Sequence, residues 1–138
     1  MKALIIPEDP TLDQYIIKPV VERIYEEVGR RCRVIMLSEP RIQGVDQALD
    51  AECVAAILDR YPMIDLLLLV FDRDCDVDRE SGRLAARLTQ ASAAGKTMFG
   101  CLAVEEVETW ALALHHQSKD GKWKDVRKEC HPKEVHFE

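Results

Sequence analysis

Short, mainly apolar runs alternate along this chain with segments in which apolar residues recur every three or four positions. The runs lie at 3–6, 33–37, 64–71 and 97–102, and each has the length of a strand. An apolar run without polar alternation is typical of a strand covered on both faces of its sheet. The run at 64–71 contains four consecutive leucines, so it predicts the central strand.

Helical periodicity occupies the intervals between these runs. Apolar residues recur on one stripe through 16–28, which Gly29 ends, and Thr11 or Asp13 is positioned to cap its start. Pro19 lies inside this stripe, so the sequence predicts either a kink there or a helix whose regular part begins near Pro19. Further helices are expected at 46–60, 81–94 and 104–116.

The order of these elements predicts the fold class. Strands that alternate with helices are typical of an α/β protein with a parallel sheet and helices on both faces. We therefore expect a Rossmann-like three-layer sandwich with a mainly parallel sheet of about four strands. Residues 1–117 form this domain, and 118–138 are expected to be a C-terminal extension packed on it, with six basic and five acidic residues.

Composition and charge narrow the classes of function. With 138 residues, of which 47% are hydrophobic and 32% charged, the chain has the balance of one globular domain. A net charge of −6 argues against a protein that coats nucleic acid through bulk charge, although a metal ion can bring phosphates to an acidic enzyme. Five cysteines without a C-x-x-C pair, and no apolar run of membrane-spanning length, predict a cytoplasmic protein without membrane association.

Acidic residues follow two of the predicted strands. Glu8 comes after the first strand, and Asp72 and Asp74 come after the third. Ligands of open parallel sheets bind beyond the carboxyl ends of the strands, so these carboxylates converge if the two strands are neighbours. Converging carboxylates need a cation, and Mg²⁺ (or Mn²⁺) prefers such oxygen ligands. We therefore expect a metal site at this edge.

Two further acidic residues are candidate ligands with a plainer alternative. Asp76 belongs to the loop after the third strand, where a solvated surface loop is the preferred explanation. Glu108 belongs to a group of glutamates that opens the last predicted helix, where negative charge complements the helix N-terminus. Either residue could instead reach the carboxyl edge of the sheet and add a metal ligand.

Basic residues offer contacts for phosphate groups. Arg41 and Arg73 lie in loops after the second and third strands. In the C-terminal extension, Lys122, Lys124 and Lys128 surround Trp123, a combination that could hold a nucleic-acid backbone. A mixed-charge surface helix is the alternative for that segment. The sequence contains neither a G-x-x-x-x-G-K-[ST] loop nor a G-x-G-x-x-G turn.

A strand that ends in Glu, followed by a later strand that ends in Asp-x-Asp, resembles the TOPRIM domain of topoisomerases, primases and overcoming-lysogenization-defect nucleases. The resemblance implies that Glu8 acts as general acid or base and that Asp72 and Asp74 bind Mg²⁺ for phosphodiester cleavage or transfer. Asp9 and Pro10 stand where the family usually has glycine.

The chain also resembles a group of uncharacterised bacterial TOPRIM-like proteins. The phrases that carry this resemblance lie at 8–13, 40–41, 72–74, 105–110 and 123–134. This second resemblance brings no established activity, but it implies that the chain continues past Glu138. The TOPRIM resemblance implies a Mg²⁺-dependent nuclease-like protein in phage or mobile-element defence, with nucleic acid as a partner. A homodimer or a protein partner is also an open alternative.

Two other functions stay open. A response-regulator receiver also places acids after its first strand and a phospho-accepting Asp after its third, here Glu8 and Asp72. Receivers need Ser or Thr after strand four and Lys after strand five, whereas strand four here runs into Cys101, Leu102 and Ala103. The second alternative is a catalytically inactive TOPRIM-like subunit that only binds a partner.

Overall fold

A computed structural model gives the structure of the protein and describes residues 1–72, 80–103, 106–115 and 131. Its centre is one sheet of four strands: β1 (Lys2–Pro7), β2 (Arg33–Met36), β3 (Leu66–Asp72) and β4 (Thr97–Ala103). All neighbouring strands are parallel, in the order β2-β1-β3-β4. The predicted α/β class with a mainly parallel sheet of about four strands is confirmed.

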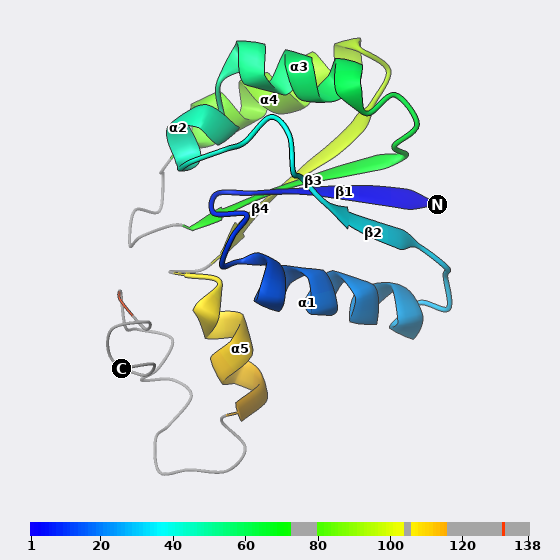
Figure 1. Ribbon diagram of the computed structural model, residues 1–138, viewed down its shortest axis with the longest axis vertical. Helices are drawn as coiled ribbons and strands as arrows, with labels where there is room; N and C mark the ends of the chain where they lie inside the picture. The colour runs from blue at the N-terminus through cyan, green and yellow to red at the C-terminus, as the bar shows by residue number, and fades with distance from the viewer. Residues whose placement is uncertain (73–79, 104–105, 116–130, 132–138) are drawn as a thin grey trace.

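Helices cover both faces of this sheet (Figure 1). α1 (Gln14–Glu27) and α5 (Glu108–His115) lie on one face, whereas α2 (Val45–Ala48), α3 (Ala51–Arg60) and α4 (Ser81–Ala93) lie on the other. The result is the expected three-layer, Rossmann-like arrangement. Among the described helices, none has the length and apolar character that a membrane crossing requires.

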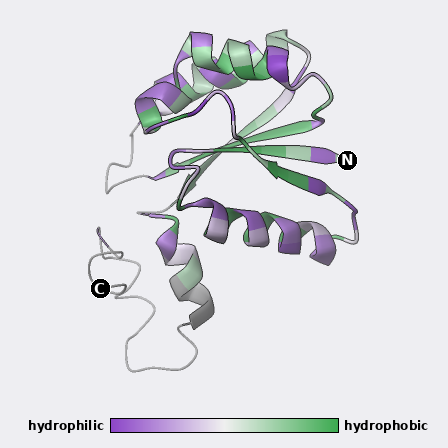
Figure 2. Ribbon diagram, in the orientation of Figure 1, coloured by the Kyte–Doolittle hydropathy of each residue, from purple (hydrophilic) through white to green (hydrophobic). Residues whose placement is uncertain are grey.

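The core consists of two apolar layers, one on each face of the sheet. Leu67, Leu69 and Phe71 of β3 belong to the layer under α3 and α4, while Val70 belongs with Ile17 to the layer under α1. Figure 2 shows the strands in hydrophobic colours, whereas the helices carry both polar and apolar residues. Because alternate residues of β3 serve opposite layers, its unbroken apolar run is explained by burial on both faces.

The predicted helix over 46–60 is wrong, because two helices occupy this region. α2 ends at Ala48 and α3 begins at Ala51, with Asp50 as its N-cap. The Asp50 side chain accepts a hydrogen bond from the backbone N–H of Cys53 at 2.8 Å. An aspartate side chain can accept hydrogen bonds from backbone N–H groups in this way and so start a new helix. The apolar periodicity through this region is continuous and therefore does not reveal the break.

Two helix boundaries also differ from expectation. α1 begins at Gln14 with Pro19 inside it, so the alternative in which the helix starts near Pro19 is wrong. Pro19 removes one backbone hydrogen bond in the second turn, and the buried Ile17 and Val21 hold the helix on the sheet. The last helix begins at Glu108 instead of residue 104.

Candidate functional site

Glu8 and Asp72 lie side by side at the carboxyl edge of the sheet. β1 and β3 are hydrogen-bonded neighbours, with Pro7 in register with Val70. The backbone N–H of Glu8 donates to the carbonyl of Val70 at 3.0 Å, and the Glu8 carboxylate accepts a hydrogen bond from the backbone N–H of Asp72 at 3.3 Å. The strand order therefore places these two candidate residues next to each other, as the sequence led us to expect.

The Asp72 carboxylate contacts the segment that leads into α5. Its Oδ1 accepts a hydrogen bond from the backbone N–H of Val107 at 3.0 Å. Burial raises the pKa of Asp72 to about 7, although the hydrogen bond from Val107 acts in the opposite direction. The negative charges of Asp13, Glu8 and Glu108 raise this pKa further, so Asp72 ionises only at the cost of placing another negative charge among carboxylates.

Asp13 belongs to the same group of acids. Its carboxylate accepts a hydrogen bond from the backbone N–H of Asp9 at 3.1 Å. Burial raises the pKa of Asp13 to about 6, and the charges of Asp9, Glu108 and Glu8 act in the same direction. The sequence offered Asp13 only as a helix cap. It is the N-cap residue of α1, but its side chain makes no capping hydrogen bond to that helix.

Glu108 completes this group from the start of α5. It is the first residue of the helix and is 9% exposed. Its charge raises the pKa of both Asp72 and Asp13, which places it among them electrostatically. We call Glu8, Asp13, Asp72 and Glu108 the carboxylate cluster. Its members come from the ends of two strands and the starts of two helices.

Asp9 shapes the turn between β1 and α1. Its Oδ1 accepts hydrogen bonds from the backbone N–H groups of Thr11 at 2.7 Å and Leu12 at 3.3 Å. Aspartate often builds turns with its own side chain in this manner. Asp9 therefore fixes the direction in which the chain turns, and this turn brings Asp13 back to the cluster.

An open pocket of about 330 Å³ adjoins the cluster, and Glu8 lines it. Arg41, an exposed side chain in the loop after β2, lines the same pocket together with Gln43. Gly44 holds this loop in place, since its backbone N–H donates to the carbonyl of Glu8 at 3.1 Å. Its φ of 84° lies in the region that favours glycine. The structure thus brings the candidate phosphate contact Arg41 to the pocket beside Glu8.

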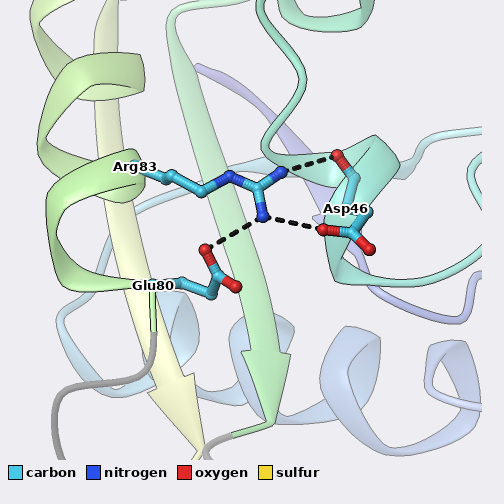
Figure 3. Close-up of polar contacts among 3 residues, drawn as sticks. All are labelled: Asp46, Glu80 and Arg83. Carbon is cyan, nitrogen blue, oxygen red and sulfur yellow. Dashed lines mark hydrogen bonds and ion pairs between the residues drawn. The ribbon is translucent and has the colours of Figure 1, made fainter.

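Arg83 joins the first turn of α4 to α2 (Figure 3). Its Nη1 donates to Oδ1 of Asp46 at 2.8 Å and to Oε2 of Glu80 at 3.0 Å, and its Nη2 donates to the carbonyl of Asp46 at 3.1 Å. Glu80 adopts a left-handed conformation with φ of 58°. Arg83 therefore connects the start of α4 to α2, a role that no sequence signal indicated.

Several predicted site residues lie outside the described residues. They are Arg73, Asp74, Asp76, Lys122, Lys124 and Lys128. Within the described part of the chain, no three His, Cys, Asp or Glu side chains are arranged so that they could hold a metal ion. Mg²⁺ nevertheless commonly binds through one or two carboxylates and completes its shell with water and substrate phosphates. The adjacent oxygen donors Glu8 and Asp72 fit that donor requirement.

Comparisons of the chain with protein-family models, with curated proteins and with solved structures gave no match. The cluster contains two partly buried carboxylates with raised pKa values, Asp13 and Asp72, a pattern that is more frequent at functional sites than elsewhere.

Proposed function

We propose that this protein is a Mg²⁺-dependent nuclease-like enzyme that cleaves phosphodiester bonds of nucleic acid at the carboxyl edge of its sheet. The observation that carries the proposal is the contact between Glu8 and Asp72 on neighbouring parallel strands. The same placement supports the TOPRIM-like assignment, in which a Glu after strand one faces an Asp after strand three. We place the activity in the cytoplasm, as the cysteine pattern favours.

The electrostatics of the carboxylate cluster favour the binding of a cation. Burial is the main reason why the pKa values of Asp72 and Asp13 are raised, and the like charges that share this partly buried site raise them further. A divalent cation reverses that effect, because it favours the ionised form of each ligand. Asp72 would hold the metal together with Glu8, and Asp74 follows two residues later in the sequence. Bound Mg²⁺ supplies polarisation of a phosphoryl oxygen.

The remaining steps belong to side chains of this chain. Glu8, at the rim of the pocket, would transfer the proton of the attacking or leaving oxygen as general acid or base. Arg41, which lines the same pocket, would bind a phosphate of the substrate, since a guanidinium forms paired hydrogen bonds with phosphate oxygens. Lys122, Lys124 and Lys128 would extend the phosphate contacts along the nucleic acid.

The test is cleavage of labelled single-stranded and double-stranded DNA and RNA with Mg²⁺ or Mn²⁺, compared with EDTA. Asp72→Asn and Glu8→Gln should each lower the cleavage rate by at least about 100-fold, the usual scale for a positioned acid–base group. Asp59→Asn is the matched control, because Asp59 is exposed on α3 and belongs neither to the carboxylate cluster nor to the lining of the pocket beside Glu8. Cleavage that survives EDTA or both site variants would contradict the proposal.

The same assay separates the alternatives. A catalytically inactive subunit would bind nucleic acid without cleaving it under any metal. A receiver-like module would instead be labelled by acetyl phosphate, and the label would be lost in Asp72→Asn. β4 ends at Ala103, whereas a receiver carries Ser or Thr after its fourth strand. We therefore rank the receiver function below the nuclease.

A further inference from the structure

An open apolar groove of about 510 Å³ runs across the sheet face that carries α1 and α5. Its walls are formed by α1 through Val20 and Ile24, by β3 through Leu66 and Leu68, by β4 through Cys101, and by α5 through Trp110. This groove is separate from the pocket beside Glu8, which lies over the loop after β2.

The apolar surface extends beyond the groove itself. Ile24 at its wall is 55% exposed, and Phe99 is 57% exposed. Phe99 lies two residues before Cys101 on β4, so both side chains point to the same face of the sheet. β4 is also an edge strand, at the end of the order β2-β1-β3-β4. A contiguous apolar surface of this kind marks a place where another segment docks.

The segment that best fits the groove is residues 116–138 of the same chain. It follows α5 directly, and Trp110 of that helix lines the groove five residues before the helix ends at His115. A segment of this length reaches across the groove many times over, at about 3.3 Å per extended residue. We therefore propose that 116–138 docks in the groove and covers it.

The sequence of the segment supplies the side chains that such docking needs. Trp123 and Val126 have helical spacing, and Val135 and Phe137 have strand spacing. Charged residues lie between them in the sequence. Trp123 is the largest of these anchors, and a tryptophan in an apolar pocket dominates the energetics of a contact.

The covalent connection to α5 favours this segment over a second copy of the chain as the occupant of the groove. A docking segment joined to the groove by a short linker has an effective concentration in the millimolar range. A second copy meets the same groove only at the bulk protein concentration, which is far lower in a dilute solution. Docking would also hold α5 against the sheet and so fix Glu108, its first residue, within the carboxylate cluster.

The test measures alkylation of Cys101 by iodoacetamide in the full chain, read peptide by peptide with mass spectrometry. Cys53, which packs on the opposite layer of the core, is the internal control. Trp123→Ala should accelerate alkylation of Cys101 about tenfold and leave Cys53 unchanged; a tenfold factor corresponds to 1.4 kcal/mol of docking free energy. Leu12→Ala, which removes an exposed apolar side chain elsewhere, should change neither rate.

Equal alkylation of Cys101 in the unsubstituted chain and in Trp123→Ala would overturn the proposal. So would protection of Cys101 that rises with protein concentration together with a dimer in light scattering, because a second copy would then cover the groove. If Trp123→Ala exposes Cys53 as well, the milder Val126→Ala replaces it and must accelerate Cys101 alone.

Discussion

The carboxylate of Asp72 accepts a hydrogen bond from the backbone N–H of Val107 at 3.0 Å and thereby connects the end of β3 to the start of α5. Val107 is 1% exposed, so its N–H lies in an interior where an unmatched donor is costly. Asp72 therefore has two roles that oppose each other. Its hydrogen bond stabilises the fold, whereas its charge, placed among Glu8, Asp13 and Glu108, destabilises it.

Replacing Asp72 in two ways should separate these roles. Asp72→Asn keeps an oxygen that can accept from Val107 and removes the charge, so we expect it to stabilise the metal-free protein at pH 8. Asp72→Ala also removes the charge but leaves the Val107 N–H without this acceptor, which costs about 1 kcal/mol relative to Asn. Urea unfolding of both variants at pH 8 with EDTA measures the difference. An Ala variant as stable as the Asn variant would show that the hydrogen bond contributes nothing.

The stability of the metal-free protein should fall as the pH rises from about 4 to 8. The pKa of Asp72 is about 7 and that of Asp13 about 6 in the folded protein, both above the ordinary value of 3.8. Between these values the folded state holds protons that the unfolded state has released, so raising the pH favours unfolding. Thermal unfolding across this range in EDTA measures the slope, and Asp72→Asn should flatten it. A slope that is identical in wild type and variant would contradict the assignment to Asp72.

Mg²⁺ should stabilise the folded protein through the same cluster. A ligand that binds only the folded state adds roughly 1.4 kcal/mol at about ten times its dissociation constant, or a rise in Tm of about 4 °C for a domain of this size. Differential scanning fluorimetry with and without Mg²⁺ at pH 8 measures this shift. Asp72→Asn should abolish it, and Asp59→Asn should retain it. An equal shift in both variants would locate the bound ion away from Asp72.

Arg83 should contribute to stability through its contacts with α2 and with Glu80. Arg83→Met removes its hydrogen bonds to Asp46 and Glu80. Because the network is exposed, the expected loss is about 1 kcal/mol. Arg23→Met is the matched control: Arg23 pairs only with neighbours on the exposed surface of α1, and its loss should cost less. Chemical unfolding of the two variants compares them directly, and equal costs would count against a joining role for Arg83.

The close approach of α4 to β4 predicts the effect of a methyl group at Gly100. A Cβ at Gly100 would lie 2.5 Å from Cδ2 of Leu84 and 2.9 Å from its Cγ. We expect Gly100→Ala to destabilise the protein by about 1–3 kcal/mol, the usual cost of overpacking. Gly82→Ala on α4, where a Cβ meets nothing within 4 Å, is the control and should be neutral or stabilising. In a Leu84→Ala background, Gly100→Ala should cost less, and an unchanged cost would contradict the proposed clash.

Several features of this protein follow from local sequence alone. Apolar runs of strand length predicted the four strands, because a strand that is buried on both faces of its sheet has no alternation of polar and apolar residues. Helical stripes predicted the helices between them, except that two helices, α2 and α3, occupy the region where one was expected. Glu8 and Asp72 were placed at strand ends by the same reasoning, since each follows directly on an apolar run. These inferences succeed because they depend on periodicities of a few residues.

Other features depend on contacts between distant segments. The strand order β2-β1-β3-β4, which makes Glu8 and Asp72 neighbours, is a property of the assembled sheet. Asp13 and Glu108 looked like residues of helix starts, and only the packing of α1 and α5 on one face brings their charges to Asp72. The physical reason is that burial and mutual repulsion arise when segments far apart in the chain enclose the same small volume, and no short window of sequence contains that information.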